Sequence, residues 1–195
     1  MKRNWGLLVL LLAAAAFAIQ PAAAQDTKHK IYIYLAEIMP MSDGTIDGGT
    51  VEAQDEMGYG IGYEFRLNKL MGLDFDYMMA THDVDYQGHK CCEIDFNPLS
   101  ASFNFHLINT NLIDFYVAPT VSYVMWGDFK IDNGPSFSTG DEFALGASAG
   151  IDVGGKKFAF VGGLRYLMLD ASPDDVPGDV SIDPLLIRAG FAFKF

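Results

Sequence analysis

The sequence has little cysteine and few basic residues. Only two cysteines occur in 195 residues, Cys91 and Cys92, and adjacent cysteines cannot join distant parts of a fold. Disulfides are therefore excluded as the main source of stability. The 13 basic residues are outnumbered by 25 acidic ones. This balance argues against nucleic acid as a partner, because phosphate backbones are bound by basic patches.

A long apolar run occurs only at the N-terminus. Lys2 and Arg3 precede the apolar stretch 6–19, and three alanines at 22–24 follow it. This order is typical of a secretory signal peptide, and the run is short for a membrane-spanning helix. We expect residues 1–24 to be removed and residues 25–195 to form one β-barrel domain. Cleavage takes away two basic residues and no acidic one, which leaves 11 against 25 and a formal charge of −14.

The final stretch, LLIRAGFAFKF (185–195), alternates without interruption. Apolar side chains occupy one face, and small or charged side chains occupy the other. This pattern is typical of a strand with lipid on one side and a narrow polar lumen on the other. The terminal Phe195 also resembles the C-terminal signal of bacterial outer-membrane proteins, which implies recognition by the barrel-assembly machinery.

The alternation predicts eight strands, at 30–39, 57–67, 71–79, 94–107, 113–125, 143–153, 158–169 and 185–195. The first is apolar on both faces, so its orientation stays open. Pro98 predicts a bulge or break in the fourth, because Ile94 and Phe96 have the opposite parity to the apolar residues after it. The long polar segments between strands, interpreted as loops, are 41–56, 81–93, 127–141 and 170–181.

Long and short connections alternate along the chain, as they do in bacterial outer-membrane barrels. A soluble barrel would turn its apolar faces inward, whereas here the opposite faces are small and polar. Without a second apolar helix, a closed barrel is the remaining way to span a membrane. We therefore predict an all-β, eight-stranded antiparallel up-and-down transmembrane barrel with short periplasmic turns and long extracellular loops. Its expected location is the outer membrane of a Gram-negative cell.

The inward residues predict a lumen with two layers. Charged side chains near the periplasmic end would neutralise one another and form a plug, with Glu64, Arg66, Asp74, His106, Asp114, Asp152, Arg165 and Arg188 as its members. The outer half would be apolar, with Met78, Val124, Trp126, Leu167, Leu169 and Leu186 as its lining. An apolar layer in a barrel this narrow is either plain packing or a site for one small hydrophobic ligand. The charged floor then favours lateral release into the membrane near Pro98.

Three stretches resemble the outer membrane protein W (OmpW) family of eight-stranded barrels, namely IDPLLIRAGFAFKF (182–195), GLRYLMLD (163–170) and FYVAPTVSYVMWGDF (115–129). The first strand, with YIYLAEIMP, departs from the family's Arg-Ala-Gly type, and Leu185 stands where an aromatic residue often follows Asp-Pro. The resemblance implies binding or passage of small hydrophobic compounds, and in some members service as a bacteriocin receptor. The alternative is a structural or receptor barrel that contacts cells, phage or bacteriocins through its loops and has no transport role.

Other kinds of site find less support. Possible metal ligands gather in one predicted loop, with His82, Asp83, Asp85, His89, Cys91 and Cys92 as its members, but their spacing matches no zinc motif, and free thiols or a vicinal disulfide are the favoured interpretation. We expect no resident metal, no cofactor and no catalytic residue, because His106 has no serine motif beside it. Acidic loops could share divalent cations with lipopolysaccharide, which is an expected partner together with outer-membrane lipid.

Overall fold

The computed structural model describes residues 28–42, 44–46, 49–86, 88–127, 129–131, 136–137, 140–171, 180–181 and 183–195. Eight long strands make up the wall: β1 (His29–Pro40), β4 (Glu56–Arg66), β5 (Met71–Tyr86), β6 (His89–Asn109), β7 (Ile113–Trp126), β10 (Glu142–Gly154), β11 (Phe158–Met168) and β14 (Pro184–Lys194). Six short strands accompany them: β2 (Gly44–Ile46), β3 (Gly49–Ala53), β8 (Phe129–Ile131), β9 (Ser136–Phe137), β12 (Asp170–Ala171) and β13 (Val180–Ser181). The expected signal peptide lies outside the described residues.

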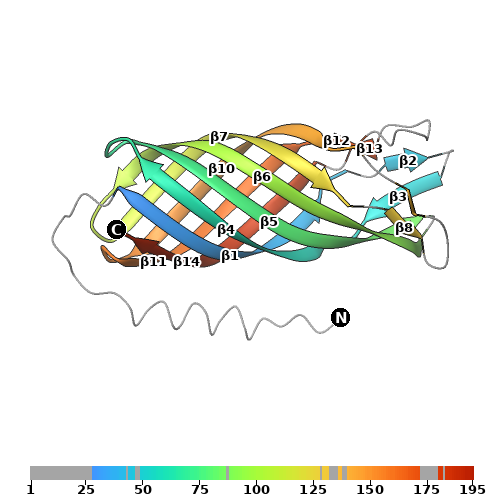
Figure 1. The fold of residues 1–195 in the computed structure, drawn as a ribbon, viewed down its shortest axis with the longest axis horizontal. Helices are drawn as coiled ribbons and strands as arrows, with labels where there is room; N and C mark the ends of the chain where they lie inside the picture. The colour runs from blue at the N-terminus through green and yellow to red at the C-terminus, as the bar shows by residue number, and fades with distance from the viewer. Residues whose placement is uncertain are drawn as a thin grey trace.

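The long strands close into an antiparallel ring (Figure 1). The last strand, β14, pairs with β11 on one side and with β1 on the other, from Lys30↔Lys194 to Pro40↔Pro184. Closure leaves no strand edge to be satisfied in hydrocarbon. The predicted eight-stranded antiparallel barrel is therefore confirmed. No described residue belongs to a helix long and apolar enough to cross a membrane.

Connections at the two ends of the barrel differ in length. Turns of three or four residues join β4 to β5, β6 to β7 and β10 to β11 at one end, where the C-terminus also lies. The small strands β2, β3 and β8 lie beyond the opposite end (Figure 1). Segments 41–56, 127–141 and 170–181, interpreted from the sequence as loops, contain all six short strands. The lumen therefore runs between a short-turn end and a long-loop end.

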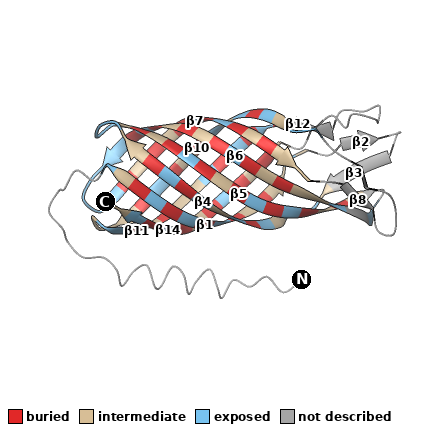
Figure 2. Cartoon of the chain, viewed as in Figure 1, coloured by how far each residue is buried: buried red, intermediate tan, exposed pale blue. Residues whose placement is uncertain are grey.

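Side chains alternate between the wall's two faces along every long strand, and Figure 2 shows the resulting chequered pattern of buried and exposed residues. In β1, the strand whose orientation the sequence left open, Tyr32 and Tyr34 face the lumen while Ile31 and Ile33 face outward. A shift of one residue would reverse every side chain. Pairing with β4 and β14 on both sides therefore fixes which half of this doubly apolar strand lines the interior.

The predicted loop 81–93 is wrong. β5 and β6 continue through it as one hairpin, paired from Ala80↔Phe96 to Tyr86↔His89. Met79 is the last apolar outward residue of β5, and the outward residues that follow it, such as Thr81 and Asp83, are polar. A strand that has left the hydrocarbon has no apolar outward face, and its sequence therefore resembles a loop.

At Pro98, where the sequence predicts a bulge or a break, the structure shows no bulge, but the pairing with β5 is broken. Phe96, Pro98 and Ser100 all face inward with one parity, and the register between β5 and β6 is the same before and after them. What changes is the hydrogen-bonded ladder, in which Met78 and Met79 of β5 have no paired residue in β6. Proline has no N–H for the ladder, so the strand continues while its pairing is interrupted. Register shifts occur instead at Val84/Asp85 and His106/Ile108.

Candidate functional site

The lumen contains two layers of buried side chains. The polar plug, nearer the short-turn end, consists of Lys30, Glu64, Arg66, Asp74, Asp76, His106, Asp114, Asp152, Arg165, Arg188 and Lys194. The apolar layer, nearer the long-loop end, consists of Ile38, Met78, Phe96, Val124, Trp126, Leu167, Leu169 and Leu186, with small alanines between them. The eight residues predicted for the plug and the six predicted for the apolar layer all face the lumen, with Arg66 and Trp126 only partly buried, and their roles stay predictions.

The lower part of the plug is built around Glu64 and Asp114. Glu64 lies 2.5 Å from the Lys30 ammonium and 3.2 Å from Nε of Arg66. His106 lies between the two carboxylates, with Nε2 3.0 Å from Glu64 and Nδ1 2.8 Å from Asp114. Arg66 also forms an ion pair with Asp114. Each carboxylate therefore has a cation and an imidazole as partners, as buried charges require.

A third carboxylate links this cluster to the first and last strands. Asp152 of β10 lies 3.3 Å from the ammonium of Lys30 in β1 and 3.0 Å from that of Lys194 in β14. Lys30 thus contacts two acids from strands on opposite sides of its own position. Glu64 lies on the paired neighbour β4, whereas the contacts of Asp152 connect β10 to β1 and β14, strands with which β10 does not pair through its backbone.

The middle of the plug is centred on Asp76. Arg165 binds both carboxylate oxygens, at 3.0 Å and 2.5 Å, in the two-pronged geometry that suits guanidinium and carboxylate. Arg188 lies 3.5 Å from Oδ1, and the Tyr34 hydroxyl donates to Oδ2 at 2.7 Å. Nε of Arg165 also donates to the Ser148 hydroxyl at 3.1 Å. The carboxylate of Asp76 is thereby held by three side chains from three other strands.

Glycines in β4 make room for two tyrosine rings that lie across the inner face of this strand. Tyr32 and Tyr34 of β1 lie opposite Gly62 and Gly60 of β4. A Cβ atom at Gly62 would overlap the ring of Tyr32, and one at Gly60 would overlap the ring of Tyr34. The rings therefore pass over β4 to β5, where Tyr32 donates to Asp74 at 2.7 Å.

The polar plug is electrically balanced and closed. Five cations, Lys30, Arg66, Arg165, Arg188 and Lys194, face the five carboxylates of Glu64, Asp74, Asp76, Asp114 and Asp152. Glu64 and Arg165 are at most 1% exposed. At this level a cavity of only about 10 Å³ is lined by Tyr32, Tyr34 and Arg188 among others, so paired side chains fill most of the lumen.

Side chains of the apolar layer pack against one another. Met78, Val124 and Leu167 have no exposed surface. The ring of Trp126 lies 5.3 Å from that of Phe96, and its Nε1 has no hydrogen-bond partner. A ligand in this layer would therefore have to displace side chains, and a binding role for these residues stays a prediction.

Several lumen residues were missed by sequence reasoning. Lys30, Tyr32 and Tyr34 come from the strand that is apolar on both faces. Asp76 faces inward like Asp74, two residues earlier, but was not among the residues predicted for the plug. Lys30 carried a usable signal, because a lysine at membrane depth must face the lumen and its parity then fixes the whole strand.

The possible metal ligands of segment 81–93 point to different sides of the wall. His82 faces inward on the hairpin extension, while Asp83 faces outward and pairs with Lys90 at 2.9 Å. Among the described residues no group of three or more possible ligands could hold a metal ion. The side chains of Cys91 and Cys92 lie outside the description. All four histidines, His29, His82, His89 and His106, lie in strands.

His82 is the buried titratable group of the hairpin extension. Its Nδ1 lies 3.1 Å from the backbone oxygen of Gln54, so this nitrogen carries the proton and donates it. The ring meets that of Phe96 edge-on at 5.7 Å. Burial lowers the pKa of His82 below its usual value, because the charged form is poorly solvated there, while the Gln54 carbonyl opposes the shift.

Comparison with known proteins agrees with the architecture. Residues 9–195 match the family described as outer membrane protein beta-barrel domain, and no curated protein matches the chain. OprG from Pseudomonas aeruginosa superposes with a TM-score of 0.76 at 21% identity, covering 91% of this chain and 99% of OprG. Neisserial surface protein A gives 0.62 at 14% identity, covering 86% of this chain and 97% of that protein. At these identities, the likeness shows the fold alone.

The family match and the structure together fix the setting of the lumen. An apolar outer wall surrounds a lumen whose charged layer lies near the short turns, and in outer-membrane barrels such turns face the periplasm. The polar plug is therefore the periplasmic layer, and the apolar layer is the extracellular one. The chain belongs to the outer membrane protein β-barrel domain family, as an eight-stranded antiparallel barrel of the Gram-negative outer membrane.

Proposed function

We propose that this chain is an OmpW-type barrel that takes small hydrophobic molecules into its apolar layer and releases them sideways into the membrane. One observation carries the proposal, namely that an apolar layer at the extracellular side lies directly above a sealed and neutral polar plug. An apolar molecule that enters from outside meets side chains of its own polarity and then a barrier to the periplasm. The OmpW-like stretches 163–170 and 182–195 supply strands β11 and β14 of this lumen. The proposal assigns no catalytic residue.

The interruption beside Pro98 provides the lateral exit. Pro98 pairs with Val124 of β7, a member of the apolar layer, and its missing β5 partner would be Met78, another member. A second interruption lies opposite Pro119, where Phe103 and Asn104 of β6 have no partner in β7. That one is at the level of polar side chains, so of these two interruptions the one at Pro98 lies beside the apolar layer.

The outer wall near this exit is concave and apolar. A groove of about 660 Å³ faces the lipid along β1, β4 and β14, and it reaches Tyr77 and Met79 of β5 at its edge. Met79 is also one of the two β5 residues without a partner opposite Pro98 and Asn97. A molecule that leaves the lumen there would therefore meet an apolar surface rather than a polar one.

Binding can be tested with Trp126, which is the only tryptophan of residues 25–195. The refolded barrel in vesicles is titrated with a small brominated alkane, and a second sample contains a lipid with a brominated tail. The proposal predicts saturable quenching of Trp126 by the small compound and much weaker quenching by the lipid. Absence of saturable quenching would exclude an accessible apolar site.

Release is tested with Pro98→Ala, which restores the missing N–H, and with Pro119→Ala as the matched control. Transfer of a fluorescent hydrophobic probe from outside into the vesicle bilayer should slow several-fold in Pro98→Ala and stay unchanged in Pro119→Ala. Equal rates in both variants and in the wild type would contradict lateral release.

A receptor role is the alternative, and one observation favours it. The β5–β6 hairpin continues past the apolar belt into the extracellular space, where Asp83 and Lys90 are exposed. If deleting residues 81–95 abolished recognition by a partner cell, phage or bacteriocin while the quenching experiment stayed negative, the receptor interpretation would replace the transport one.

A further inference from the structure

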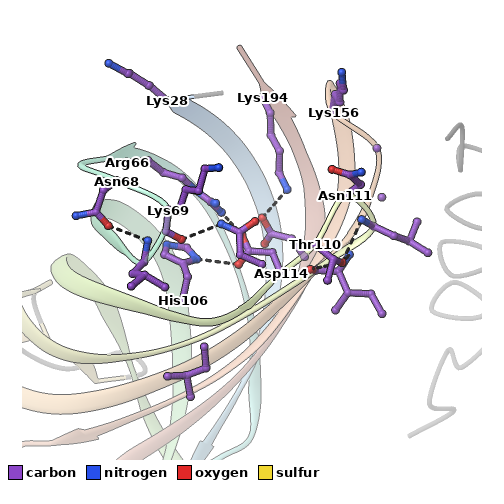
Figure 3. A pocket seen from close by; sticks show the side chains of 18 of the residues that line it. Lys28, Arg66, Asn68, Lys69, His106, Thr110, Asn111, Asp114, Lys156 and Lys194 are labelled. Carbon is purple, nitrogen blue, oxygen red and sulfur yellow. Dashed lines mark hydrogen bonds and ion pairs between the residues drawn. The ribbon is translucent and has the colours of Figure 1, made fainter. Parts of the chain in front are cut away.

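The periplasmic mouth of the barrel forms an open cavity of about 600 Å³ below the polar plug. We call it the vestibule. Lys28, Lys69 and Lys156 lie on its rim, with Arg66 and Lys194 deeper in its lining. Figure 3 shows Lys28 and Lys156 on either side of the mouth in this view, with Lys194 between them and paired inward. The three rim lysines come from separate parts of the chain, so closure of the barrel is what brings them together.

The three rim lysines give the periplasmic mouth an excess of positive charge. The plug holds five acids and five bases, whose formal charges cancel, and each carboxylate is ion-paired there except Asp74, which accepts a hydrogen bond from the Tyr32 hydroxyl. No ion pair or hydrogen bond links the ammonium groups of Lys28, Lys69 or Lys156 to another described residue. The acids in the vestibule lining, Asp114 and Asp152, are both paired within the plug. A net positive charge of about three is therefore left at the mouth.

This excess contrasts with the charge of the whole chain. Residues 25–195 hold 11 basic residues against 25 acidic ones, yet seven of the 11 lie at the periplasmic end: Lys28, Lys30, Arg66, Lys69, Lys156, Lys157 and Lys194. The extracellular end carries exposed or half-buried acids such as Asp83, Glu93 and Asp95. A concave site of one sign with low-dielectric walls concentrates the field and attracts ions of the opposite sign.

The lining around the lysines suits one class of anion. The amide side chains of Asn68 and Asn111 add uncharged donors, and the leucines Leu67, Leu70 and Leu112 expose between 42% and 65% of their surface beside them. Lysine binds phosphate as a point charge that does not demand a fixed geometry. We propose that the vestibule binds a phosphate-bearing anion, either the headgroup of a phospholipid from the periplasmic leaflet or a soluble phosphate ester. The proposal is independent of the lateral-release function, which concerns the other end of the lumen.

The test compares a triple variant, Lys28→Gln with Lys69→Gln and Lys156→Gln, against wild type in the refolded barrel. Native mass spectrometry counts retained phosphatidylglycerol and, as a zwitterionic reference, phosphatidylcholine. A separate ³¹P NMR titration with glycerol phosphate in detergent measures soluble phosphate. Lys156→Gln and Lys157→Gln form a matched pair, because Lys157 carries the same charge in the same turn without lining the vestibule.

Each lysine near an anionic surface contributes roughly a 5-fold change in affinity, so the triple variant should bind about 100-fold more weakly at low salt. Lys156→Gln should weaken binding about 5-fold, and Lys157→Gln should leave it within about 2-fold. Preferential retention of phosphatidylglycerol would identify a lipid headgroup, and binding of glycerol phosphate would identify a soluble ester. Unchanged binding in the triple variant, equal losses in Lys156→Gln and Lys157→Gln, or no binding of either probe would overturn the proposal.

Discussion

Removing the charge of Asp76 should destabilise the barrel strongly, because two buried guanidinium groups depend on it. Arg165 reaches both of its oxygens, at 3.0 Å and 2.5 Å, and Arg188 lies 3.5 Å away. Asp76→Asn keeps the shape of the side chain and removes its charge. The variant leaves two cations facing each other in a site from which water is excluded, with no carboxylate between them.

Breaking a buried ion pair by removing one partner costs about 3–5 kcal/mol, because the other charge stays buried without compensation. Asp76→Asn strands two cations, so we expect a loss of about 4 kcal/mol or more in the free energy of unfolding. The exposed pair of Asp83 and Lys90, 2.9 Å apart, is the matched control. Asp83→Asn should cost only about 0–1 kcal/mol, because water screens that pair.

The assay is urea unfolding of residues 25–195 in lipid vesicles, followed by the fluorescence of Trp126. With a slope of about 2 kcal/mol per M, a loss of 4 kcal/mol lowers the unfolding midpoint by about 2 M. Asp83→Asn should move it by less than about 0.5 M. If the two variants shifted the midpoint equally, the plug would not be held by a desolvated ion-pair network, and its role as a barrier would lose its basis.

Two further predictions concern close packing and pH. Gly62→Ala should destabilise the barrel by about 1–3 kcal/mol in the same assay, because the new Cβ overlaps the Tyr32 ring. The control is Gly162→Ala, whose new Cβ would lie 3.7 Å from its nearest neighbour and should be nearly neutral. Equal losses of stability in the two variants would refute the packing of Tyr32 over Gly62. The β5–β6 hairpin should open more readily as the pH falls through about 6.5, since burial lowers the pKa of His82 and the open hairpin therefore takes up the proton first. Hydrogen exchange of residues 80–96 at pH 7.5 and 5.5, corrected for intrinsic rates, should show this difference in wild type and lose it in His82→Gln; a difference that persists in the variant would assign the effect to another group.

The sequence by itself determined the architecture and the direction of most side chains. In 57–67 every odd residue is apolar and no even residue is, and because strand side chains alternate strictly, this parity assigns lipid and lumen faces without any tertiary information. The same rule placed Glu64, Asp114 and Arg165 on the inner face, where all three side chains are buried. It failed at 81–93, where β5 and β6 have left the membrane and no apolar face marks them as strands.

Only the tertiary structure decided which inward residues meet. Lys30 contacts Glu64 and Asp152, which are 34 and 122 positions away in the sequence, because β1 lies beside β4 and across the lumen from β10. Parity gives the face of a side chain, but the register between strands and the closure of the ring give its neighbours. The same closure leaves three lysines unpaired around the vestibule, since charge balance is a property of the assembled lumen and not of any one strand.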